Sequence, residues 1–376
     1  MKASGRLASV LLVVIIAGSV TGCPPVCYVL GGSGDPCVEL TVVPALGSHA
    51  DLYGTVTHVN PCLYRVAVYI YVEAGGGWWN KPLLAAPLTE IANDGTWTAD
   101  ITTGGTDEDA TKIAVFLVPA DCEVDILEGA AKLPTSLLDA AIAHDAVERG
   151  AGGTTRLLYF GGYEWWVKAS DTAVGPGPNL FSDSRDNVWL DSERQLHLKI
   201  TKNAKNGDTY ECAEVVCRDN LGYGTYVFSM ASRVDNLDPN CVLGLFTWSD
   251  DPAYNYREMD IELSRWGNPL DDNAQFVVQL WDTPGNLERF NMWPCETSVH
   301  GFNWQADAIA FRSVCGEDYG TQDPNLQVHD WLYEGEDIPV PGSESARINL
   351  WLAWGNAPQN EEEAEAVVAD FQFIVD

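Results

Sequence analysis

Residues 257–262 read Arg-Glu-Met-Asp-Ile-Glu, which places Glu258, Asp260 and Glu262 at alternate positions. Strict alternation of acidic and apolar residues predicts a strand with one polar face and one apolar face. Over such a strand the Cα atoms of Glu258 and Glu262 lie about 13 Å apart. Side chains that lean together bring the two carboxyls to about 5–6 Å, where one carboxylate can attack a sugar carbon while the other protonates the leaving oxygen with retention. Asp260 would hydrogen-bond the nucleophile and raise the pKa of its neighbours by like-charge repulsion.

The alternative is a solvated acidic face on an exposed edge strand. The flanking segments, residues 243–248 and 263–266, argue against it because both are rich in strand formers and large aromatic residues. Aromatic rings beside buried acids are suited to stacking on sugar rings. We therefore interpret the three carboxylates as catalytic groups in a cleft.

The chain begins with an export signal. Lys2 and Arg6 precede an apolar run over residues 7–20, and a small-residue site ends at Cys23. This arrangement resembles a bacterial lipobox, so Cys23 is predicted to be lipidated and the protein anchored at the cell membrane or outer surface. The alternative is an ordinary signal peptide cut near Gly22, which would give a secreted protein. No other apolar run is long enough to span a membrane, so the lipid would be the only membrane attachment.

The 376 residues carry a formal net charge of −33. A surface this acidic repels phosphate backbones, which argues against nucleic acid as a partner. It is compatible with a neutral polysaccharide, or with a salty medium that screens self-repulsion. We expect a monomer.

The chain has ten cysteines. With Cys23 lipidated, the next four could form two bridges, and the last five must leave at least one thiol free. Neither the cysteines nor the six histidines show metal-ligand spacing, so no metal or other cofactor is predicted.

The chain is predicted to be all-β. Glycine, proline and short alternating segments predominate, and helical patterns are scarce. The expected organisation is a signal peptide over residues 1–22, a tether over 23–37, a small β-sandwich module over 38–150 and a two-sheet, concanavalin-like jelly roll over 151–376. The module is predicted to end in a helix over Thr135–Arg149, stopped by Gly150.

The C-terminal region resembles glycoside hydrolase family 16, the jelly-roll enzymes that act on β-linked glucans and galactans. The resemblance covers about 190 residues. Besides the hexapeptide it includes Cys-Ala-Glu-Val at 212–215, Gly-Tyr-Gly-Thr-Tyr at 222–226, His-Gly-Phe-Asn-Trp at 300–304 and Asn-Leu-Trp at 349–351. The chain departs from the lichenase pattern at Val216, where the family has arginine, and at Val277. Gln372 stands where family members often carry a calcium-binding aspartate.

The resemblance implies roles for individual residues. Glu258 would be the nucleophile, Glu262 the general acid and base, and Asp260 would assist Glu258. The implied substrate-binding residues are Glu214, Trp248, Tyr256, Gln279, Asn349 and Trp351. Tyr256, two residues before the nucleophile, is expected to point to the same face as the acids. For Trp248 and Trp351, packing in the core is an equally good interpretation.

The expected function is therefore retaining, endo-acting hydrolysis of a β-linked polysaccharide, a β-glucan or related galactan. Two alternatives remain. One is a transglycosylase that remodels a surface polysaccharide, and the other is a non-catalytic carbohydrate-binding lipoprotein on the same fold.

Overall fold

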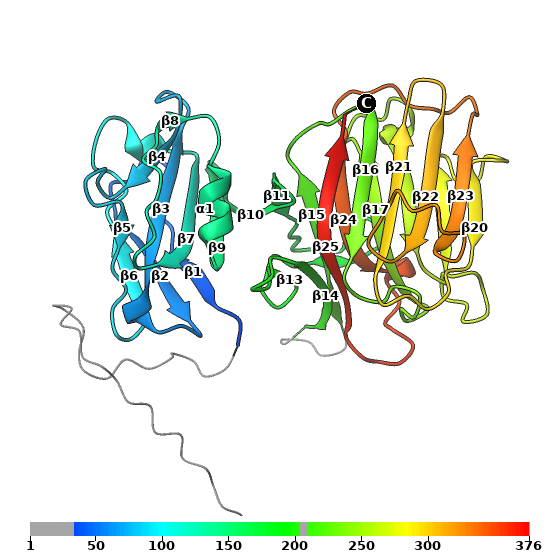
Figure 1. Cartoon of the computed structure of the whole chain (residues 1–376), viewed down its shortest axis with the longest axis horizontal. Helices are drawn as coiled ribbons and strands as arrows, with labels where there is room; N and C mark the ends of the chain where they lie inside the picture. Colours follow the sequence, from blue (N-terminus) through cyan, green and yellow to red (C-terminus); the bar gives the residue numbers. More distant parts are fainter. Residues whose placement is uncertain (1–33, 204–208, 376) are drawn as a thin grey trace, which may run out of the picture.

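The computed structural model describes residues 34–203 and 209–375, which form two lobes built almost entirely from antiparallel strands (Figure 1). The N-terminal lobe is a β-sandwich. Its smaller sheet contains β1 (Cys37–Val42), β2 (Leu52–Thr57) and β6 (Thr96–Ala99). Its larger sheet contains β3 (Tyr64–Val72), β4 (Gly77–Lys81), β5 (Leu88–Thr89), β7 (Lys112–Pro119), β8 (Glu128–Ala130) and β9 (Ala143–Gly150). Branched apolar side chains from both sheets fill the space between them. The predicted leader, the lipidation site Cys23 and most of the tether lie outside the described residues.

The helix predicted over Thr135–Arg149 is wrong beyond its first turns. Helix α1 covers only Thr135–Ala140, and the chain then continues as strand β9. Strand β9 pairs with β7 on one side and with β10 (Gly153–Phe160) on the other. A strand in that position satisfies backbone groups on both sides, and this tertiary pairing overrides the local helical preference.

The two lobes share one hydrogen-bonded sheet. The predicted boundary at residues 150 and 151 lies in the tight turn between β9 and β10. Strand β10 pairs with β11 (Tyr163–Val167), and β11 pairs with β15 (Tyr210–Cys217) of the C-terminal lobe. The larger sheet of the N-terminal lobe therefore continues into the sheet that carries the acidic hexapeptide.

The C-terminal lobe is a two-sheet jelly roll. The first sheet runs β11–β15–β24–β17–β18–β19–β20, with β24 at Ser345–Leu352, β17 at Cys241–Trp248, β18 at Met259–Leu263, β19 at Ala274–Val278 and β20 at Leu287–Phe290. The second runs β13–β14–β25–β16–β21–β22–β23, with β13 at Val188–Leu190, β14 at Leu196–Lys202, β25 at Ala364–Ile374, β16 at Gly224–Met230, β21 at Ser298–Trp304, β22 at Ile309–Cys315 and β23 at Gln327–Tyr333. The short strand β12 (Leu180–Phe181) pairs in parallel with β15.

The core between the two sheets fixes which face of β18 points outward. Met259, Ile261 and Leu263 are fully buried in that core. Across it, Phe276 of the first sheet stacks on Phe311 of the second, with ring centroids 5.1 Å apart. Because side chains alternate along a strand, the acidic residues of β18 must lie on the opposite face of the sheet.

The cysteines of the C-terminal lobe are divided between one bridge and free thiols. Cys295 and Cys315 form a disulfide, and three buried cysteines are free, in agreement with the predicted unpaired thiol: Cys212, Cys217 and Cys241. Over the described ranges, no helix has the length and apolar character needed to cross a bilayer.

Candidate active site

Strand β18 presents the three acids to one side of the first sheet. Asp260 and Glu262 lie within the strand, and Glu258 directly precedes it in an extended conformation, with φ −95° and ψ 123°. All three line one groove of about 880 Å³ on the outer face of the sheet. The alternation read from the sequence therefore places these carboxyls together.

The register of the sheet arranges the groove in rows across the strands. The Glu262 row reads Glu214, Asn349, Gly244, Glu262, Gln275 and Arg289 across β15, β24, β17, β18, β19 and β20. Gly244 makes room in this row, because a Cβ at that position would lie 2.5 Å from Oδ1 of Asn349. In the Asp260 row the neighbours of Asp260 are apolar, Phe246 on β17 and Val277 on β19.

Hydrogen bonds hold two of the carboxyls in place. The side-chain amide of Gln275 donates to Glu262 (Nε2–Oε2 2.6 Å), and that of Gln279 donates to Asp260 (Nε2–Oδ2 3.0 Å). Asp260 in turn shares a hydrogen bond with Glu258. Each acid therefore has at least one polar partner, as buried ionisable groups require.

Burial raises the pKa of all three acids. Desolvation, followed by the charge of Glu262, raises the pKa of Glu258 to about 8. Desolvation raises the pKa of Glu262 to about 7, against the lowering effects of Gln275 and Arg289. The pKa of Asp260 lies well above its usual range for the same first reason, with Glu258 and Glu262 adding to it. The apolar neighbours of Asp260 explain why desolvation dominates, and Asp260 keeps a proton that it can donate to Glu258.

Glu214 forms a separate ion-pair cluster at the β15 side of the groove. It is 1% exposed. Its Oε2 accepts from Lys168 Nζ (2.8 Å) and its Oε1 from Arg347 Nη1 (3.1 Å). Since both oxygens are occupied by cations, Glu214 is placed to orient Arg347 and Lys168 in the groove wall.

Tryptophans form much of the groove wall, at Trp248, Trp266, Trp281, Trp351 and Trp354. Trp351 is largely buried, whereas Trp281 and Trp354 are 62% and 59% exposed. Exposed aromatic rings of this kind can stack on sugar rings.

The expected position of Tyr256 on the strand is wrong. Residues 254–257 all have positive φ, and Tyr256 lies in a 3₁₀ turn over Asn255–Arg257 before strand pairing begins at Met259. Tyr256 is not among the residues that line the groove. Its ring lies parallel to that of Trp248, a groove residue, with centroids 4.6 Å apart and an interplanar angle of 6°.

The structure brings the other proposed site residues into the same groove: Glu214, Trp248, Glu258, Asp260, Glu262, Gln279, Asn349 and Trp351. Sequence reasoning missed the cations Lys168, Arg289 and Arg347 and the tryptophans Trp266, Trp281 and Trp354 as groove residues. Arg347 had a readable signal, since it alternates with Asn349 and Trp351 along one strand. The others reach the groove from loops or from the sheet edge, where the sequence has no comparable pattern.

Among solved structures, the Bacillus licheniformis β-glucanase is similar to 59% of this chain and covers 98% of its own length, with 17% identity and a TM-score of 0.44. A β-1,3-1,4-glucanase (lichenase) from a mouse hindgut metagenome covers 56% of this chain and 92% of its own, at 23% identity and a TM-score of 0.41. An antigen and pseudo-β-1,3-glucanase of Mycobacterium tuberculosis covers 56% and 91%, at 19% identity and a TM-score of 0.42. Neither a protein-family model nor a curated protein matches the chain.

Proposed function

We propose that this protein hydrolyses a β-linked polysaccharide, a β-glucan or related galactan, at internal bonds and with retention of configuration. The observation that carries the proposal is the set of three carboxyls in a tryptophan-lined groove, with Asp260 buried and Glu258 and Glu262 half-buried. Buried acids that keep protons near neutral pH are what general acid catalysis requires. The strongly acidic chain supports a neutral substrate, because a polyanion would be repelled.

The proposed mechanism is a double displacement. Ionised Glu258 forms a bond to the anomeric carbon while the bond to the leaving oxygen breaks, and Glu262 gives its proton to that oxygen. Glu262 then takes a proton from water, whose oxygen displaces Glu258 and restores both carboxyls. The hydrogen bond with Asp260 lowers the pKa of Glu258 and so favours the ionised form that acts as nucleophile.

An exchanged assignment has one observation in its favour. Burial raises the pKa of Glu258 as well as that of Glu262, and a raised pKa is expected of an acid rather than of a nucleophile. Azide rescue separates the two assignments. With an activated β-glycoside, azide replaces a missing nucleophile with inversion, whereas after loss of the acid/base it attacks the glycosyl-enzyme and gives net retention. We expect an α-azide from Glu258→Ala and a β-azide from Glu262→Ala. The opposite pair of products would exchange the roles.

The proposal is tested by measuring reducing-end release from mixed-linkage glucan, laminarin, xyloglucan, agarose and carrageenan. Glu258→Gln removes the proposed nucleophile, and Glu317→Gln is the matched control at an exposed position. We expect release from one polymer, lost in Glu258→Gln and kept in Glu317→Gln. Transfer to added oligosaccharide in place of reducing-end release would identify a transglycosylase. Tight retention on one polymer without any bond cleavage would identify a carbohydrate-binding protein.

A further inference from the structure

Arg289 reaches the acid Glu262 through one intervening side chain. It lies on β20, directly opposite Gln275 on β19. Its Nη1 donates to Oε1 of Gln275 (2.9 Å), and Nε2 of Gln275 donates to Oε2 of Glu262 (2.6 Å). The three side chains form one continuous path across the edge of the groove.

The direction of this path follows from the chemistry of arginine. A guanidinium has only donors, so the atom of Gln275 that faces it must be the amide oxygen. The amide nitrogen of Gln275 is thereby turned toward Glu262. Without Arg289 the amide could rotate by half a turn and present its oxygen to Glu262, which would destabilise the ionised form of that carboxyl.

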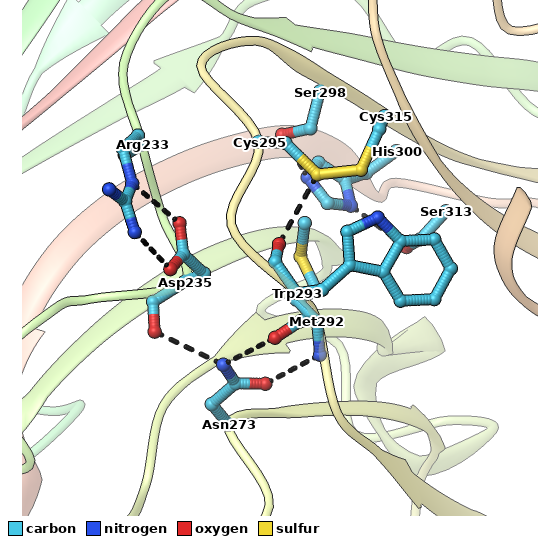
Figure 2. Close-up of a disulfide and its surroundings, with 10 residues drawn as sticks. All are labelled: Arg233, Asp235, Asn273, Met292, Trp293, Cys295, Ser298, His300, Ser313 and Cys315. Carbon is cyan, nitrogen blue, oxygen red and sulfur yellow. Dashed lines mark hydrogen bonds and ion pairs between the residues drawn. A yellow bond between two sulfur atoms is a disulfide. The ribbon is translucent and has the colours of Figure 1, made fainter. Parts of the chain in front are cut away.

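The arginine is itself held firmly. Its side chain is 23% exposed, and its Nη2 donates to the backbone oxygen of Asp272. Asn273, the residue after Asp272, forms a bracket around Met292 in the segment that follows β20. Its side-chain amide accepts from the backbone N of Met292 (2.7 Å) and donates to the backbone O of Met292 (3.1 Å). Figure 2 shows this bracket beside the disulfide that ties Cys295 to Cys315 on β22. The start of β19 and the exit of β20 are thus fixed around Arg289.

We propose that Arg289 is a positioning residue for the reaction, which locks the amide of Gln275 so that Glu262 always meets an N–H donor. This inference rests on the proposed function. The donor stabilises the carboxylate that Glu262 becomes once it has protonated the leaving group, so the benefit arises as the glycosidic bond breaks.

The other charged groups around Glu262 are few. On its own segment they are Glu258 and Asp260. On β17 the residue paired with Glu262 is Gly244, which has no side chain and no charge. The ion pairs of Glu214 with Lys168 and Arg347 lie beyond β17. Because Arg289 and Gln275 lower the pKa of Glu262, their loss should raise it. At alkaline pH activity falls because Glu262 loses its proton. In variants that lack Arg289 or Gln275 this fall should occur at a higher pH.

The test compares Arg289→Met, Arg289→Lys and Gln275→Leu on two substrates. On the polymer cleaved by the wild type we expect kcat to fall about tenfold in Arg289→Met, because a hydrogen bond to a charged group is lost. KM should change little, and the alkaline limb of the pH profile should move up by about one pH unit. Arg289→Lys should recover part of the loss. An aryl glycoside with a leaving group that needs no protonation should be cleaved at close to the wild-type rate by all three variants.

Arg65→Met is the matched control, since that half-buried arginine lies in the other lobe, where it pairs with the exposed Glu90 and donates to the backbone oxygen of Tyr64. Equal losses on both substrates with an unmoved alkaline limb would overturn the inference and leave a structural role for Arg289. A wild type inactive on every substrate would refute the proposed function instead. In that case the ¹³C titration of the Glu262 carboxyl in Arg289→Lys and Gln275→Leu still decides the inference, which is overturned if the pKa does not rise in Gln275→Leu.

Discussion

Replacing Glu258 by glutamine tests the electrostatics of the groove through stability. Burial and the charge of Glu262 raise the pKa of Glu258 from 4.5 to about 8. At about 1.4 kcal/mol per pKa unit, ionising Glu258 costs about 5 kcal/mol more in the folded protein than in the unfolded chain. Glutamine keeps the shape without the charge. Because the variant no longer carries this cost, we expect a gain of about 5 kcal/mol in the free energy of unfolding at pH of about 8.5.

The sign follows from proton binding. The folded-state pKa lies above the unfolded value, so between pH 4.5 and about 8 the folded protein binds more protons than the unfolded chain. The free energy of unfolding of the wild type therefore falls as pH rises through this window. Glu258→Gln lacks this slope. The difference between variant and wild type should be close to zero below pH 4.5 and complete near pH of about 8.5.

Urea unfolding followed by tryptophan fluorescence at the two ends of this window measures the effect. Glu317→Gln, an exposed position, corrects for the change in overall charge of this very acidic chain. The reasoning is refuted if both variants gain the same stability at alkaline pH. A gain in Glu258→Gln that is equally large at acid pH would also contradict it, because that gain could not come from ionisation.

Three further expectations concern packing and architecture. Gly244→Ala should lower the free energy of unfolding by about 1–3 kcal/mol and remove much of the activity, since its Cβ would lie 2.5 Å from a buried amide oxygen. The control Gly104→Ala, at a position with open space around it, should change neither the urea midpoint nor kcat. Replacing Cys295 and Cys315 by serine should cost about 3 kcal/mol, the loop-closure value for a separation of 20 residues. A reducing agent should lower the thermal midpoint of the wild type by more than that of the double variant, which keeps the disulfide of Cys62. A chain starting at residue 151 should aggregate in size-exclusion chromatography, because removing β9 exposes the edge of β10; a monodisperse, fully active fragment would show that the shared sheet is dispensable.

The acidic hexapeptide shows how far local pattern reaches. Met259 and Ile261 are fully buried while Glu258 and Glu262 line the groove, as period-two alternation requires. The same reasoning failed at Tyr256, three residues before pairing begins, because it extended the strand back into a run of four residues with positive φ, Tyr254 to Arg257. Non-glycine residues rarely adopt that conformation, and this segment contains no glycine to announce it.

The sequence pattern also failed to predict strand pairing around residue 145. The segment after α1 contains alanine and other residues compatible with a helix, yet it forms β9 between β7 and β10. The partners lie on both sides of it in the sheet. The sequence of one segment does not show which strands will pair with it, so its helical propensity did not predict its structure.

The sequence by itself determined the all-β class, the face of β18 that carries the acids and the residues able to do acid chemistry. These depend on residue type and on a period of two, which are local properties. Only the tertiary structure decided that Gln275 and Arg289 meet Glu262, that Gly244 leaves room beside it, and that the two lobes share a sheet. Those contacts join strands that are distant in the chain, and their register is set by the packing of the whole sheet rather than by any one segment.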